Sequence, residues 1–297
     1  MPTEVQELRV PVAGRTLEVV TAGPRDGMPL VYHHGTPGAA QPFRLLIDAA
    51  ADRGLRTVTY SRPGYASSTP HSGRTVADAA TDTAAVLDAL GADRFVTIGW
   101  SGGGPHALAC AALLPGRCAA AATLAGVAPY RAEGLDWLAG MGPENVEEFT
   151  LAERGGPALT SYLEDEARVL ATVTADDVAT ALGGLISDVD RAALTDEFAE
   201  YSATTFRRAL ARGVAGWRDD DLGFLRGWGF DLAAITAPVA VWQGDQDRMV
   251  PYAHGVWLAA HVPNARRHLH PGEGHLSLSV GSFGRILDDL LDLARPA

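Results

Sequence analysis

The stretch that decides the fold is Phe95-Val96-Thr97-Ile98-Gly99-Trp100-Ser101-Gly102-Gly103, followed by the apolar segment 105–114. Its first four residues are apolar and partly β-branched, which predicts a short buried strand. The segment that follows is rich in Ala and Leu and has Pro105 in its first turn, which predicts a helix. A serine between two glycines at a strand-to-helix turn holds its hydroxyl exposed on a strained backbone. We therefore take Ser101 as the candidate nucleophile.

The composition favours a globular protein with a full core. Of the 297 residues, 47% are hydrophobic and 20% are charged, which suits one large α/β domain or one domain with an insertion. The formal net charge of -12 argues against nucleic acid or an anionic membrane surface as the main partner. Every basic side chain is an arginine. The absence of lysine excludes Schiff-base catalysis and a Walker A phosphate loop.

Cysteine usage and the N-terminal sequence predict a cytoplasmic protein. Cys110 and Cys118 are too few for a disulfide framework and are interpreted as small buried hydrophobes in a reducing compartment. Residues 1–7 lack the basic and apolar regions of a signal peptide. No run approaches the roughly 20 apolar residues that a membrane span needs. The oligomeric state stays open, with a homodimer as one option.

Predicted strands and helices alternate over most of the chain, which implies right-handed crossovers and a mostly parallel sheet. Strands are expected at 5–12, 15–22, 30–33, 55–60, 95–98, 118–126, 239–242 and 267–270, and helices at 42–53, 75–90, 105–114, 252–261 and 281–294.

The alternation stops near residue 127, and the next hundred residues carry only helical patterns. These patterns cover 143–154, 157–171, 175–182 and 196–212. We interpret 128–235 as a helical cap inserted into an α/β core made of 1–127 and 236–297. The acidic run Asp219-Asp220-Asp221 within the cap is interpreted as a solvated helix start.

A serine nucleophile needs a base, usually a histidine that a carboxylate orients. His275 follows the last predicted strand and is the candidate base. Asp245 and Asp247 follow the strand at 239–242 and are both candidates for the acid, while Glu273 is expected to serve the turn beside the histidine. Catalytic groups gather at the carboxyl ends of strands in open parallel sheets. These residues are therefore predicted to meet Ser101 at one edge of the sheet.

Acyl transfer also needs two donors for the developing oxyanion. The N–H of Gly102 lies at the start of the helix that follows the nucleophile, where backbone donors point outward. The second donor is expected from the loop His34-Gly35-Thr36-Pro37-Gly38. Pro37 has no N–H to donate, and we assign this role to Thr36. His34 is expected to brace the loop.

Five segments together resemble the α/β-hydrolase fold superfamily: His34–Gly38, Ser61–Ser68, Gly99–Gly103, Gly244–Asp247 and Gly274–His275. The chain order Ser, Asp, His is also the order found in that superfamily. The resemblance implies an eight-stranded, mostly parallel sheet flanked by helices, with a cap after strand six. It also places the acid at Asp247, giving a Ser101–His275–Asp247 triad, and leaves Asp245 to bond the turn backbone.

The resemblance implies a cofactor-independent serine hydrolase that cleaves a small ester, lactone or related acyl bond, with no metal. The His-Gly-x-Pro-Gly and Gly-x-Ser-x-Gly motifs also look like the proline iminopeptidase and esterase branches, although iminopeptidases usually carry glycine at the position of Thr36. An amidase that holds a free amine therefore stays an alternative, as do carbon–carbon bond hydrolysis and perhydrolysis. A ligand receptor without catalysis is an alternative from a different class.

The expected substrate pocket lies between the strand-to-helix turn that carries Ser101, which we call the elbow, and the cap. We expect His34, Trp100, Tyr130 and Trp137 to line it. Further aromatic and apolar candidates in the cap are Leu138, Met141, Phe149, Tyr162, Phe206, Trp217, Phe224 and Trp228. The cap is also acidic, with Glu144, Glu147, Glu148, Glu153, Glu164 and Glu166. A solvated face explains these glutamates most simply, and a binding site for a substrate ammonium is the alternative.

Overall fold

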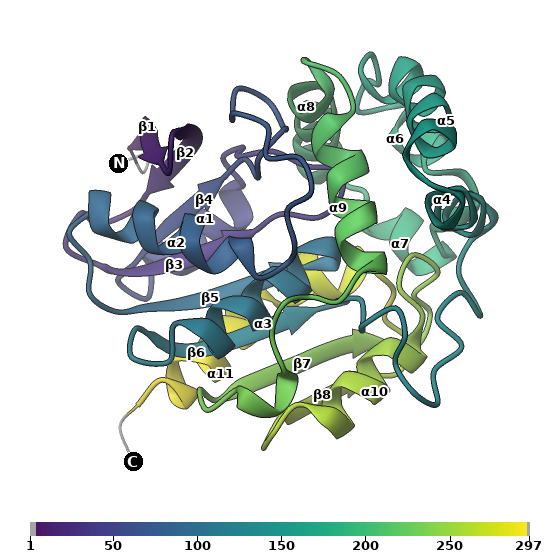
Figure 1. The fold of residues 1–297 in the computed structure, drawn as a ribbon. Coiled ribbons are helices and arrows are strands. Elements are labelled where there is room, and N and C mark those ends of the chain that lie inside the picture. The colour runs from purple at the N-terminus through teal and green to yellow at the C-terminus, as the bar shows by residue number, and fades with distance from the viewer. Residues whose placement is uncertain (1–3, 296–297) are drawn as a thin grey trace.

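Eight strands form one sheet in the computed structural model, which describes residues 4–295. They are β1 (Val5–Val12), β2 (Arg15–Ala22), β3 (Met28–His33), β4 (Leu55–Tyr60), β5 (Phe95–Trp100), β6 (Cys118–Leu124), β7 (Val239–Gly244) and β8 (Arg266–His270). Their order in the sheet is β1-β2-β4-β3-β5-β6-β7-β8 (Figure 1). β2 runs antiparallel to β1 and to β4, and all other neighbours run parallel. The predicted sheet is confirmed.

Helices cover both faces of the sheet. α1 (Arg44–Ala51) and α11 (Ser277–Leu293) pack together on one face, and α2 (Asp78–Ala89), α3 (Gly104–Leu113) and α10 (Tyr252–His261) cover the other. Successive residues of β3 enter the two different cores, with Leu30 on the α1 and α11 side and Val31 on the α3 side. This alternation follows from the two-residue period of a strand. A strand buried on both faces therefore shows a continuous apolar run in the sequence.

The segment between β6 and β7 is helical and stands over the ends of the strands (Figure 1). Its helices are α4 (Pro143–Arg154), α5 (Gly156–Leu170), α6 (Val178–Ala181), α7 (Asp188–Ala193), α8 (Asp196–Leu210) and α9 (Ala215–Leu225). A hydrophobic cluster that includes Leu159, Leu163, Leu210 and Trp217 joins α5, α8 and α9 to Tyr65 of the core. The cap thus has apolar contacts of its own and a seam with the core.

The interpretation of the acidic run as a solvated helix start is wrong. Asp219, Asp220 and Asp221 lie in the middle of α9 and are 4%, 1% and 0% exposed. Two arginines of core loops, Arg62 and Arg74, pair with Asp220 in the interior. Sequence spacing cannot reveal partners that lie more than a hundred residues away, so the run was placed on the surface by default.

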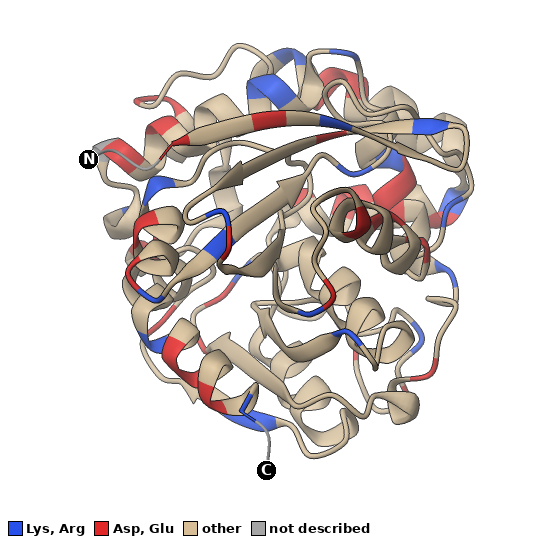
Figure 2. Cartoon of the chain, turned by 90° about the vertical axis from the view of Figure 1, so that its left-hand side faces the viewer, with Lys and Arg blue, Asp and Glu red and all other residues tan. Residues whose placement is uncertain are grey.

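The central strands β3, β5, β6 and β7 contain no Lys, Arg, Asp or Glu, and most of the charged residues lie on the helices and loops around them (Figure 2). Within residues 4–295, no helix combines the length and the apolar character that a membrane crossing requires.

Candidate active site

Ser101 lies at the tight turn between β5 and α3. Its φ of 56° is in the left-handed region, which is unfavourable for a residue with a side chain. The turn is tight because backbones approach closely: a Cβ on Gly99 would lie 2.1 Å from the carbonyl oxygen of Gly103, and one on Gly103 would lie 2.1 Å from that of His33. Only glycine fits at these two positions. The local sequence therefore holds the serine side chain at the end of the sheet.

Asp247 and His275 meet in the interior, on the loops that follow β7 and β8. The Nδ1–H of His275 donates to Oδ2 of Asp247 over 2.8 Å. Asp247 Oδ1 accepts the N–H groups of Met249 (2.9 Å) and Val250 (2.8 Å), and its Oδ2 also accepts from Gln243 Nε2 at 3.0 Å. These donors hold the carboxylate still. Because the carboxylate can only accept, it fixes the proton on Nδ1 and leaves Nε2 as the basic nitrogen.

The surroundings of His275 favour its protonated form. Burial by itself lowers the pKa of the imidazole, but the charge and hydrogen bond of Asp247 and the charge of Asp190 outweigh burial and raise it above the ordinary 6.5. An imidazole of this kind is well suited to take a proton from a neighbouring hydroxyl. Ser101 and His275 line the same cavity.

Asp190 on α7 holds the loop that carries His275, and sequence reasoning missed it. Its carboxylate is fully buried and accepts the N–H groups of His275 (3.1 Å), Leu276 (2.7 Å) and Ser277 (3.1 Å). Ser187 donates its hydroxyl to the same carboxylate at 2.9 Å. A side chain of the cap thereby satisfies the open N–H groups at the start of α11.

The loop at the end of β3 lies beside Ser101, the candidate nucleophile. A Cβ on Gly35 would lie 3.4 Å from Cβ of Ser101, and one on Gly102 would lie 2.4 Å from Oγ1 of Thr36. The two residues predicted to supply the oxyanion donors, Thr36 and Gly102, are therefore adjacent, and both line the cavity that contains Ser101. The structure brings together the segments that the sequence analysis had selected.

Arg62 holds the loop at the end of β3 in place through hydrogen bonds to its residues 34–36. Its guanidinium donates to the carbonyl oxygens of His34 (2.5 Å) and Gly35 (2.9 Å) and to Oγ1 of Thr36 (3.0 Å). The N–H of Arg62 donates to Nε2 of His34 at 3.3 Å, and Nδ1–H of His34 donates to Gly35 at 2.8 Å. Burial and the nearby guanidinium hold the pKa of His34 well below 6.5. His34 is thus a neutral brace, as predicted.

Asp220 of the cap completes the support. It accepts hydrogen bonds from Arg62 at 2.6 Å, from the hydroxyl of Tyr65 at 2.8 Å and from Oγ1 of Thr36 at 2.9 Å, and it pairs with Arg74 at 2.6 Å. The charges of the two arginines outweigh burial and keep its pKa well below the ordinary range. The hydroxyl of Thr36 is thus held by this carboxylate and by the guanidinium of Arg62.

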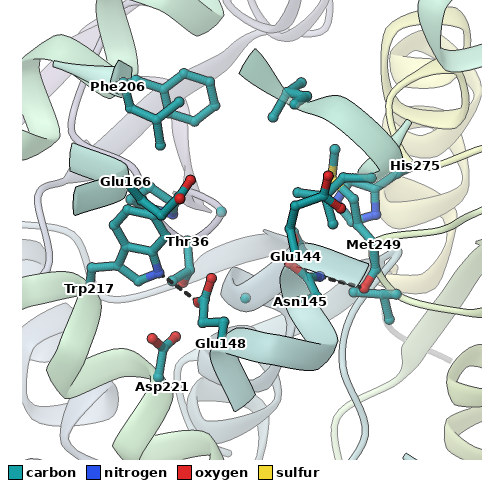
Figure 3. A pocket seen from close by; sticks show the side chains of 18 of the residues that line it. Thr36, Glu144, Asn145, Glu148, Glu166, Phe206, Trp217, Asp221, Met249 and His275 are labelled. Atoms are coloured by element: carbon teal, nitrogen blue, oxygen red, sulfur yellow. Dashed lines mark hydrogen bonds between the residues drawn. The ribbon is translucent and has the colours of Figure 1, made fainter. Parts of the chain in front are cut away.

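The cavity between elbow and cap is lined by the candidate catalytic groups and by cap side chains (Figure 3). His34 and Trp100 line it as expected. Tyr130 and Trp137 lie outside the lining: the hydroxyl of Tyr130 donates to Glu153, and the indole of Trp137 donates to the carbonyl of Ala128. The other cap residues that were predicted to line the pocket also fall into two groups. Phe149, Tyr162, Phe206, Trp217 and Phe224 line the cavity, whereas Leu138, Met141 and Trp228 are not among the lining residues.

Comparison with known proteins identifies the family. The family model described as alpha/beta hydrolase fold matches residues 28–282. A non-heme chloroperoxidase of Streptomyces lividans is 29% identical over 261 residues, which cover 87% of this chain and 88% of the relative. A putative carbamate hydrolase of Variovorax paradoxus (strain S110) is 26% identical over 275 residues, 91% of this chain and 93% of its own. The crystal structure of an esterase from Rhodococcus sp. ECU1013 aligns with a TM-score of 0.67 at 21% identity, covering 97% and 99% of the two chains. The chain belongs to the α/β-hydrolase fold family and is an enzyme of the hydrolase class.

Proposed function

We propose that the protein is a serine hydrolase of a small-molecule ester or related acyl compound, with Ser101, His275 and Asp247 as its triad. The observation that carries the proposal is the Nδ1–H bond of His275 to the buried Asp247 carboxylate, since His275 lines the same cavity as Ser101 on its strained turn. Nε2 of His275 takes the proton of the Ser101 hydroxyl as its oxygen attacks the carbonyl carbon. The N–H groups of Thr36 and Gly102 bind the oxyanion that forms.

The second half of the reaction uses the same groups. His275 first returns its proton to the leaving group, which departs and leaves Ser101 acylated. Water then attacks the acyl carbon while Nε2 accepts the water's proton, and the oxyanion donors act again. Collapse of this intermediate releases the acid and the Ser101 hydroxyl. No step requires a metal or an organic cofactor.

Replacement of the nucleophile tests the proposal. Ser101→Ala is expected to lower kcat/KM for a p-nitrophenyl ester by at least about a thousandfold, because the acyl-enzyme cannot form. The variant Ser67→Ala, which changes a serine of a core loop, is the control for protein quality. Turnover of the ester by Ser101→Ala at a rate near that of the wild type would contradict the assignment.

A further inference from the structure

Four carboxylates enter the cavity that contains Ser101, and all come from cap helices (Figure 3). Glu144 and Glu148 belong to α4, Glu166 to α5 and Asp221 to α9. None of the described residues that line the cavity is an arginine, and the chain has no lysine. The cavity thus gathers four acidic side chains, with neither arginine nor lysine among the described residues of its lining.

Asp221 distinguishes this group from an acidic surface. It is 0% exposed, and neither of its carboxylate oxygens accepts a hydrogen bond from a donor in residues 4–295. Its neighbour Asp220 has two arginines as partners. A buried carboxyl group without donors is strongly unfavourable. The cap therefore holds an acceptor inside the cavity for which the protein supplies no donor.

Glu148 lies next to Asp221 and is also a buried carboxyl group with few hydrogen-bond donors. It is 8% exposed and accepts one hydrogen bond from the indole of Trp217 at 2.8 Å. Burial raises the pKa of Glu148 to about 7 and, with the adjacent Glu148 carboxylate, raises that of Asp221 well above its ordinary value. Ionisation of these two neighbouring carboxyl groups is therefore unfavourable without a counter-charge, and a bound cation supplies one.

The arrangement suits an organic cation. No group of three or more acidic, His or Cys side chains in the described residues is placed to hold a metal ion. The carboxylates instead surround a space that Tyr162, Phe206 and Trp217 also line. Aromatic rings and carboxylates together favour an ammonium group, which offers both charge and N–H donors. Other cap glutamates, Glu147 among them, are exposed to solvent.

We propose that Glu144, Glu148, Glu166 and Asp221 bind a protonated amine of the substrate, so that the enzyme prefers acyl compounds that carry a cationic amino group away from the scissile carbonyl. This substrate preference rests on the proposed serine hydrolase function, whereas binding of the amine itself does not. Two experiments separate the claims.

The first experiment measures binding without catalysis. Ser101→Ala protein is titrated with hexylammonium, hexanol and hexanoate by calorimetry. Hexylammonium is expected to bind at least about ten times more tightly than hexanol, because charge-assisted hydrogen bonds add to the same apolar contacts, and hexanoate is expected to bind more weakly than either. Equal affinity for hexylammonium and hexanol, or tighter binding of hexanoate, would overturn the amine site.

The second experiment compares kcat/KM for two esters of equal shape, p-nitrophenyl 6-(dimethylamino)hexanoate and p-nitrophenyl 7-methyloctanoate. The wild type is expected to favour the cationic ester at least about tenfold. This ratio should fall at least fivefold in Glu148→Gln/Asp221→Asn and should fall in Glu166→Gln, whose side chain is only partly buried and tolerates exchange. Glu147→Gln, on the solvent side of α4, should keep the ratio.

The outcomes distinguish the two proposals. Turnover of the neutral ester without any preference for the cationic one contradicts the amine site and leaves the hydrolase function standing. Turnover of neither ester contradicts the ester hydrolase function, and the calorimetric titration then still decides whether the amine binds. A preference that persists unchanged in Glu166→Gln and in the double variant would overturn the assignment to these carboxylates.

Discussion

In the proposed mechanism, proton transfer from Ser101 requires His275 in its neutral form, and Asp247 both bonds that imidazole and raises its pKa. The carboxylate makes its hydrogen bond to Nδ1 while three other donors keep it in place. It thereby favours the imidazolium that forms in the transition state. The same interaction raises the pKa of His275 above 6.5. In the wild type, kcat/KM should therefore decline as the pH falls through a value above 6.5.

Asp247→Asn tests this role. We expect kcat to fall by about three to four orders of magnitude, because the amide no longer fixes the productive tautomer. The remaining activity should decline at a lower pH than in the wild type, since burial without the carboxylate lowers the pKa of His275. The measurement is the pH profile of kcat/KM for a p-nitrophenyl ester.

Asp245 offers the matched control for Asp247. Its carboxylate accepts the N–H of Gly272 at 2.8 Å and thus holds the turn, as the sequence analysis expected. Asp245→Asn should leave the pH profile in place and change kcat much less than Asp247→Asn does. The reverse ranking of the two variants would reassign the acid to Asp245.

At the scale of elements, the short helix α7 links the cap to the loop that carries His275. The N–H groups at the start of α11 have no carbonyl acceptor within the helix, and the carboxylate of Asp190 accepts them instead. It thereby orients the backbone of His275. The closing helix consequently begins at Ser277, four residues before the predicted start. Local sequence could not indicate this, because the capping carboxylate comes from a segment about 85 residues earlier.

Asp190→Asn should weaken the positioning of His275. An amide presents one acceptor where the carboxylate presents two, so at least one of the three N–H groups loses its partner. We expect kcat to fall about ten- to a hundredfold, with a smaller change in KM, and the acid limb of the pH profile to move to lower pH, since the Asp190 charge helps to raise the pKa of His275.

A second aspartate on α7 serves as the control for Asp190. Asp188 is exposed at the start of the same helix, and Asp188→Asn should match the wild type in kcat and in pH profile. Wild-type kinetics in Asp190→Asn would show that the loop holds its position without the cap carboxylate.

At the scale of the whole molecule, the buried Arg62–Asp220–Arg74 group joins cap and core. Asp220→Asn leaves two guanidinium groups buried without a counter-charge, and the free energy of unfolding should fall by about 3–5 kcal/mol. Urea denaturation followed by far-UV circular dichroism measures the change. Asp88→Asn breaks a pair of Arg117 and Asp88 at the surface and should cost less than about 1 kcal/mol. Equal losses in the two variants would contradict a structural role for the buried group.

The parts of the molecule that sequence reasoning predicted well are those with a local signal. The strand, the two glycines and Ser101 are contiguous, the loops with Thr36 and Asp247 follow the apolar strands β3 and β7, and the loop with His275 follows the short strand β8. In the cap, the predicted helices at 143–154, 157–171 and 196–212 match α4, α5 and α8 to within two residues, whereas α7 and the first turn of α9 were not predicted. Asp190 and Asp220 had no local signal because their partners come from distant segments.

The central claim is that Ser101 is the nucleophile, and covalent labelling tests it most directly. The protein is treated with a fluorophosphonate, and peptide mass spectrometry locates the adduct. The account predicts a single phosphonyl group on Ser101, formed in the wild type, absent from Ser101→Ala and much slower to form in Asp247→Asn. An adduct on a different residue, or none on the folded wild-type enzyme, would contradict it.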